Sequence, residues 1–163
     1  MLSGETAAGK YPVESVATMS KIAEETEKHI HFIKRFRNTE FHIKNTVDAI
    51  SHATCGMAID LDAKAIVACT LTGITARMIS RFRPPMDIIG LTTNRRAWYK
   101  LALSWGVIPV MSGTFTSTDV LFYHATETAK KIFDLKTGDH IIITGGHVSG
   151  VSGNTSLIKV ETI

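Results

Sequence analysis

Short apolar runs alternate along most of the chain with longer segments whose apolar residues recur at helical spacing. The runs are bounded by polar or turn residues, as strands buried on both faces are, and they occupy residues 65–68, 87–91, 107–111 and 140–144. The segments between them favour helices, which we expect at 43–62, from the turn at 70–75 to Pro84, at 94–104 and at 118–135. Strands that alternate with helices in this way predict a parallel sheet covered on both faces.

The last part of the chain departs from this alternation. Residues 145–154 contain four glycines and no helical pattern, and they lead directly into an alternating strand at 155–163. Without a crossover helix between them, the fourth and fifth strands most simply form an antiparallel hairpin at one edge of the sheet. We therefore predict an α/β protein: a three-layer α/β/α sandwich with a mixed five-stranded sheet.

One long helix is expected before this sandwich, over residues 11–37, because its apolar residues follow a three-and-four spacing. Its distal end, residues 28–37, is basic and carries Phe32 and Phe36. A nucleic-acid surface is conceivable there, but no recognition module accompanies it, so we favour an amphipathic helix with a solvated basic face. The polar stretch 38–42 is the best candidate for a domain boundary.

Composition narrows the class of protein. The chain has 163 residues, 44% of them hydrophobic and 20% charged, and a formal net charge of +3. These values are ordinary for a soluble globular protein, and the charge is too small to argue for nucleic acid as a partner. Cys55 and Cys69 have apolar neighbours, as buried free thiols do, and the first twenty residues contain no long apolar run. We therefore expect a cytoplasmic protein that does not bind membranes.

Several known sequence motifs are incomplete or absent in this chain. Gly4, Gly9 and Lys10 have the spacing of a phosphate-binding loop, but no Ser or Thr follows the lysine and no strand precedes the first glycine. His52 and Cys55 could share a metal ion, but no second pair of ligands stands at the spacing of a structural zinc site. The sequence also lacks the glycine fingerprint of dinucleotide-binding folds and the serine elbow of hydrolases. No metal site is expected.

The turn between the first strand and the following helix is the best candidate for binding chemistry. Thr70, Thr72 and Thr75 supply three hydroxyls there, and Gly73 supplies a flexible backbone. A helix start presents unpaired amide groups and the positive end of the helix dipole, so added hydroxyls make it suitable for a phosphate group. Threonines at such turns also commonly do no more than cap the helix. The residues alone leave both interpretations open.

Four separate segments carry a resemblance to a known family. They are MLSGETAAGKYPVESV, SHATCGMAIDLDAKAIVACTLTGITARMISRFRPP, NRRAWYKLALSWGVIPV and GDHIIITGGHVSGVSGNTSLIKV. They are spread from the first residue to residue 160, and the chain resembles the C-terminal third of a bacterial pyruvate kinase. The resemblance implies that residues 1–40 are a remnant of the catalytic barrel, its last strand–helix loop and last helix. Residues 41–163 would then form the regulatory domain, with strand order 3-2-1-4-5 and an antiparallel fifth strand.

The same resemblance implies what the parent enzyme does. Pyruvate kinases transfer phosphate from phosphoenolpyruvate to ADP and need magnesium and potassium, and their catalytic and metal-binding groups lie upstream of the segment seen here. Ser3 and Glu5 match positions at the edge of the active site. We therefore expect no cofactor and no kinase activity in this chain alone.

The family's regulatory domain binds phosphorylated effectors between two segments. Their counterparts here are the turn Thr70, Leu71, Thr72, Gly73, Ile74 and Thr75, and the glycine loop with Gly145, Gly146, His147, Gly150, Gly153 and Thr155. Leu71 stands where some members carry a lysine, and the loop 112–118 contains no Trp or Arg to hold a second phosphate. The expected effector is therefore a monophosphate, such as ribose 5-phosphate or AMP, rather than fructose 1,6-bisphosphate.

The resemblance also implies a homo-oligomer, a tetramer in the parent enzyme, with the fifth strands near a two-fold axis. Two other functions are kept as alternatives. The chain could be a purely structural oligomerisation module without an effector. It could also be a free-standing phosphate-dependent enzyme, for which His147 is the one candidate beside the glycine loop.

Overall fold

The computed structural model describes residues 2–148 and 154–163. The chain divides into two compact units, Met1–His31 and Phe32–Ile163, and each is described by itself. The division falls after His31, before the polar stretch 38–42. Gly150 and Gly153 of the expected effector loop lie outside the described residues.

The first unit contains two helices, α1 (Gly4–Ala7) and α2 (Pro12–Glu27). The expectation of one continuous helix over 11–37 is wrong, because α2 ends at Glu27 and α3 (Phe32–Asn38) begins separately. The sequence has no Gly or Pro at 28–31, so periodicity alone could not show this break.

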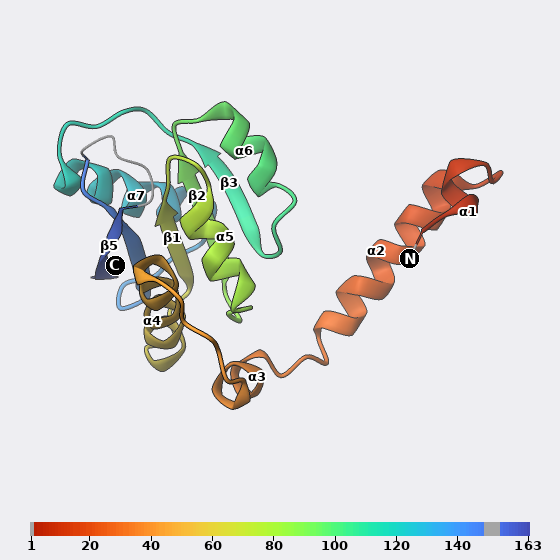
Figure 1. Ribbon diagram of the computed structural model, residues 1–163, viewed down its shortest axis with the longest axis horizontal. Coiled ribbons are helices and arrows are strands. Elements are labelled where there is room, and N and C mark those ends of the chain that lie inside the picture. The colour runs from red at the N-terminus through yellow and green to blue at the C-terminus, as the bar shows by residue number, and fades with distance from the viewer. Residues whose placement is uncertain (1, 149–153) are drawn as a thin grey trace. The chain divides into compact units, whose positions relative to one another are not determined.

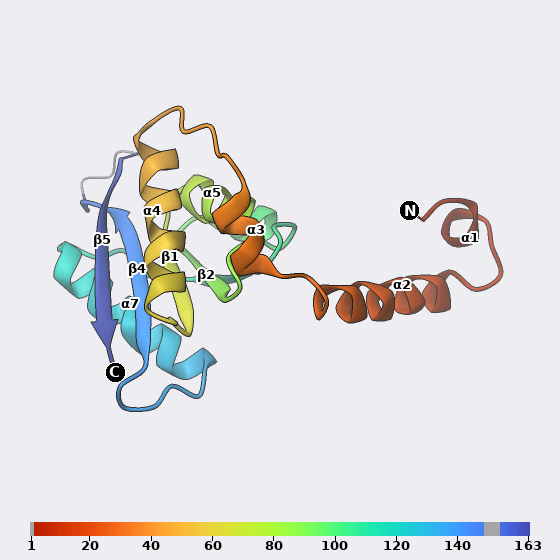
Figure 2. The same ribbon diagram turned by 90° about the horizontal axis from the view of Figure 1, so that it is seen from below.

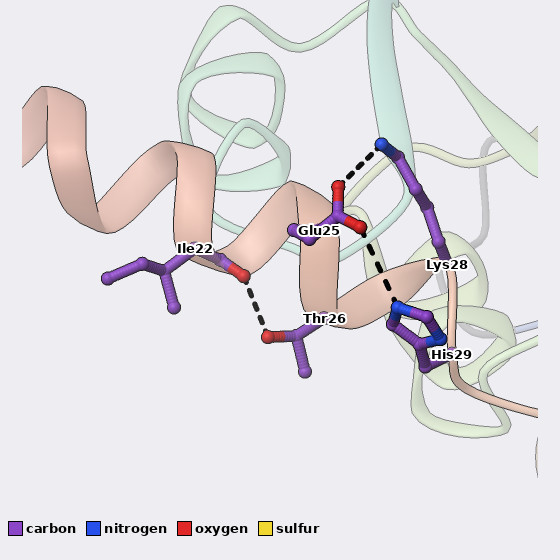
Figure 3. Close-up of polar contacts among 5 residues, drawn as sticks. All are labelled: Ile22, Glu25, Thr26, Lys28 and His29. Atoms are coloured by element: carbon purple, nitrogen blue, oxygen red, sulfur yellow. Dashed lines mark hydrogen bonds and ion pairs between the residues drawn. The ribbon is translucent and has the colours of Figure 1, made fainter.

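Polar contacts at the end of α2 accompany the break (Figure 3). The amides of His29 and Ile30 bond to carbonyls three residues back, those of Thr26 and Glu27, which tightens the last turn. Glu25 holds Lys28 at 2.6 Å and lies 3.6 Å from the ring nitrogen of His29. Within the first unit none of the residues of α2 is buried.

The second unit contains the expected sandwich. Its remaining elements, in chain order, are α4 (Thr46–Asp60), β1 (Ala65–Cys69), α5 (Ile74–Arg81), β2 (Asp87–Thr92), α6 (Arg95–Leu101), β3 (Val107–Met111), α7 (Thr118–Ile132), β4 (His140–Gly146) and β5 (Thr155–Thr162). The strand order is β3-β2-β1-β4-β5, as predicted. The first four strands are parallel, and β5 pairs antiparallel with β4, their arrows opposed in Figure 2.

Helices cover both faces of the sheet (Figure 1). One face packs on α4, α5 and α6 through a cluster that includes Ala58, Ile79 and Leu101. The other packs on α7 through Phe122, Ala125 and Ala129, among others. All five residues of β1 are buried, as the uninterrupted apolar run predicts for a central strand.

The far end of β5 is held by the backbone. The amide of Ile163 donates to the carbonyl of Asp139, and the amide of Gly138 donates to the carbonyl of Ile163. This end lies beside the start of β4, where His140 pairs with Thr162. The two ends of β5 therefore lie at opposite ends of the β4–β5 ladder, Thr162 beside His140 and Thr155 beside Gly146.

An aromatic cluster joins α3 to the sandwich. Phe36 is buried and stacks on His52 at 4.9 Å between ring centroids, while Phe41 meets Phe82 edge-on at 4.8 Å. Phe36 is thus part of the core and is not an exposed aromatic available to a nucleic acid. Among the described residues, no helix is long and apolar enough to cross a bilayer.

Both cysteines are buried free thiols, as expected, and their reactivity should reflect this. Burial raises the pKa of Cys55, and it raises the pKa of Cys69 to about 12. We expect a thiol reagent to modify neither cysteine until the chain unfolds.

Because the folded thiols hold their protons to higher pH than unfolded ones, the unfolded state is favoured as pH rises above the pKa of a free thiol, about 8.5, towards 12. The urea midpoint should therefore fall across this range, and it should fall less when Cys69 is replaced with alanine. An equal fall of the urea midpoint in the wild-type and Cys69→Ala proteins would show that Cys69 does not contribute to this pH dependence.

Candidate functional site

A cavity of about 320 Å³ opens where the parallel strands end. Its lining includes Cys69 at the end of β1, Thr92 at the end of β2, Ser112 just after β3 and Gly146 at the end of β4. The strand order reverses direction between β1 and β4, and open α/β sheets bind ligands in the crevice at such a point. The fold itself therefore places the cavity at a site suited to a ligand.

The turn between β1 and α5 forms one wall. Thr70, Leu71, Thr72, Ile74 and Thr75 line the cavity, so the structure brings five of the six expected turn residues to it. The sixth is Gly73, the N-cap of α5. Its φ of 84° lies in the left-handed region that favours glycine, and a Cβ there would meet Leu101 at 3.3 Å.

Hydrogen bonds within the turn show which of its amides and hydroxyls are paired inside the turn. The amide of Gly73 donates to Thr70 Oγ1 at 3.0 Å, so Thr70 braces the turn while keeping its own proton. The amide of Arg77 donates to the carbonyl of Gly73 and starts the helical pattern. The amides of residues 74–76 come before that first helical donor, as the first amides of any helix do.

The start of β5 adjoins this turn in the cavity lining. Thr155 lines the cavity, and its Oγ1 lies 2.6 Å from Oγ1 of Thr75, a hydrogen bond across 80 positions of sequence. Gly146 and His147 also line the cavity. Gly145 does not, but its Cα packs so closely that a Cβ would lie 3.1 Å from that of Cys69.

Sequence reasoning missed the contribution of β2. Thr92 is 2% exposed, donates its hydroxyl to the carbonyl of Leu71 at 3.3 Å and accepts the amide of Asn94 at 3.2 Å. Thr93 lines the cavity beside it. Because the carboxyl ends of parallel strands lie on the same side of the sheet, the threonine pair at the end of β2 was a signal that could have identified them.

Apart from the imidazole of His147, the described lining residues offer contacts of two kinds. Among the described residues that line the cavity there is no Lys, Arg, Asp or Glu. Hydroxyls and helix amides supply polar contacts, while Leu71, Ile74, Phe115 and Leu121 supply apolar ones. Such a site can hold an anion by hydrogen bonds and accommodate an uncharged body beside it.

Ser3 and Glu5 belong to the first unit and contact each other. The carboxylate of Glu5 accepts the amide of Ser3 at 3.0 Å and its hydroxyl at 3.2 Å. Hydrogen bonds from the backbone amides of Glu5 itself and of Ser3 lower the pKa of Glu5. No group of three or more His, Cys, Asp or Glu within residues 2–148 and 154–163 could hold a metal ion.

Comparison with known proteins gives a consistent result. The family model described as "Pyruvate kinase, alpha/beta domain" matches residues 48–161. Pyruvate kinase from Clostridium acetobutylicum is 42% identical over 164 residues, which cover 100% of this chain and 35% of the relative. The Staphylococcus saprophyticus enzyme is 41% identical over 164 residues, covering 100% and 28%. The Clostridium perfringens enzyme is 35% identical over 166 residues, covering 100% and 35%. The chain thus spans about a third or less of the length of these relatives.

Proposed function

The chain belongs to the pyruvate kinase family, and from that premise we propose that it is an effector-binding and oligomerisation domain of such an enzyme. In this proposal the cavity takes a phosphorylated metabolite, and its occupancy regulates phosphate transfer from phosphoenolpyruvate to ADP in the longer enzyme. Magnesium and potassium would serve that reaction and not this cavity. A cytoplasmic location is part of the proposal, because buried free thiols suit a reducing compartment.

One observation carries the proposal: the cavity joins the start of α5 to the β4–β5 region at the switch point of the sheet. The amides at the start of α5 and the hydroxyls of Thr70, Thr72 and Thr75 suit a phosphoryl group. A hydrogen bond to a charged group contributes about 1.5–3 kcal/mol, so several of them can hold one phosphate without a lysine.

The described lining favours a ligand with one phosphoryl group. The start of α5 supplies one cluster of amides and hydroxyls for that group, and the described lining residues include no Lys or Arg to hold a second dianionic group. We therefore propose a sugar monophosphate or a nucleoside monophosphate as the ligand class. The apolar side chains of Leu71 and Phe115 suit the uncharged remainder of such a molecule.

Replacing Thr70, Thr72 and Thr75 together with alanine tests the site. We expect the affinity for ribose 5-phosphate to fall about tenfold or more, because three hydroxyl donors are lost. Isothermal calorimetry on the 163-residue chain measures it. Unchanged affinity would remove the phosphate from this turn.

Two controls sharpen this test. Thr26 and Thr39 are exposed and Thr6 is half-buried, and all three donate their hydroxyls to local carbonyls and do not line the cavity, so their triple replacement with alanine should leave affinity unchanged. Leu71→Lys places a cation beside the turn at a position that is 41% exposed, and it should tighten binding.

The oligomeric role is proposed for β5, the strand at the edge of the sheet. Val160 is half-exposed on it, while Lys159 and Glu161 pair at 2.6 Å and keep the edge from being uniformly apolar. A purely structural oligomerisation module is the second candidate, favoured by this same edge. It would be supported if the chain self-associates and no phosphorylated metabolite shifts its melting temperature.

A further inference from the structure

A single hydroxyl pair carries an inference about how the cavity works. Thr75 lies in the first turn of α5 and Thr155 is the first residue of β5, and their Oγ1 atoms are 2.6 Å apart. The two residues are 4% and 5% exposed, so bulk water has little access to either hydroxyl. Both nonetheless line the cavity.

We propose that Thr155 is a positioning residue of this site, which orients the hydroxyl of Thr75 towards a bound phosphate and ties the start of β5 to the occupied turn. This inference rests on the proposed function, since it needs a phosphate at the start of α5. It assigns to Thr155 a role through Thr75 rather than a direct contact with the ligand.

The number of hydrogens that each group can donate explains this role of Thr155. Each hydroxyl has one proton to donate and can accept others, so in the empty cavity either threonine can be the donor of the bond. A phosphate ester above pH 6 or so is mainly a dianion, which accepts hydrogen bonds and donates none. Once it binds beside the amides of residues 74–76, the hydroxyl of Thr75 donates its hydrogen bond to the phosphate. The pair then stays bonded only if Thr155 donates to Thr75.

The ligand therefore selects one of two arrangements and lengthens a chain of hydrogen bonds. The chain runs from Thr155 through Thr75 to the phosphate, and bonds in such a chain strengthen one another when one end is charged. Thr155 pairs with Gly146 next to a bulge in the β4–β5 ladder, where pairing is irregular. Occupancy of the cavity should accordingly stabilise the start of β5 more than its far end.

Calorimetry with ribose 5-phosphate on the 163-residue chain at pH 7.5 tests the proposal. Thr155→Val removes the hydroxyl but keeps the shape, and we expect about three- to tenfold weaker binding, the range of one ordinary hydrogen bond. Thr155→Ser keeps the hydroxyl and should bind within about twofold of the wild type. Thr54→Val is the matched control: Thr54 is fully buried, donates to the carbonyl of Ile50 on α4 and does not line the cavity.

Hydrogen exchange of the wild-type protein gives a readout that a folding defect in a variant cannot imitate. Ribose 5-phosphate should slow exchange at amides 155–158 more than at 159–162. If wild type and Thr155→Val bind ribose 5-phosphate with equal affinity, or if the ligand does not change the amide exchange rates in β5, the inference is wrong but the proposed function is not affected. A wild-type chain that binds no ribose 5-phosphate would overturn both.

Discussion

Replacing Ile142 with alanine is expected to lower the free energy of unfolding by about 2–5 kcal/mol. Ile142 is fully buried in β4, between β1 and β5, and belongs to the cluster that packs on α4 and α5. Alanine leaves a void that neighbouring strands, bonded on both sides, cannot close. Urea unfolding followed by circular dichroism measures the loss.

The neighbouring residue on β5 provides the control. Val160 pairs with Ile142 across the ladder, but it is 40% exposed. Val160→Ala should cost about 1 kcal/mol or less, the span of strand preferences at exposed positions. If both replacements cost the same, the described core would not be the main source of stability in this unit.

Gly146→Ala is expected to destabilise the protein by about 1–3 kcal/mol and to abolish measurable binding of ribose 5-phosphate. A Cβ at this position would lie 2.1 Å from the backbone carbonyl oxygen of Asn154. Because that oxygen belongs to backbone, the strand must move, and Thr155 must move with it. The paired threonines would separate, and the wall of the cavity would shift.

Gly113→Ala is the matched substitution in the same cavity. Gly113 lines it from the loop after β3, and a Cβ there would meet nothing within 4 Å. Stability should change by no more than about 0.5 kcal/mol, and binding should persist. If the Gly146→Ala protein were as stable as the Gly113→Ala protein, the backbone around Gly146 and Asn154 would accommodate the added methyl group without cost, and this prediction would be wrong.

The architecture could be predicted because the strong signals are local. Five strands and the antiparallel fifth strand followed from apolar runs and from the missing crossover before β5, whereas the strand order was implied by the family resemblance, and the structure has both. Element ends were less accessible, because caps decide them: α4 begins at Thr46 since Asn45 accepts the amide of Asp48. The break after α2 has no Gly or Pro to announce it.

The site was only half accessible from sequence. The threonines of the first turn stood out because several hydroxyls fall within six residues. The bond between Thr75 and Thr155 could not be seen, since it joins positions 80 apart. In the sequence Thr92 is only a polar residue at the end of a strand. Its hydrogen bond to the carbonyl of Leu71 follows from the pairing of β2 with β1.

Because β5 runs in the reverse direction, the residue that follows it lies far from the cavity. Ile163 follows the end of β5 that lies beside the start of β4, whereas the cavity lies where β4 finishes. An eight-residue strand spans about 25 Å. A surface tether attached at Ile163 can therefore hold the protein without obstructing the cavity.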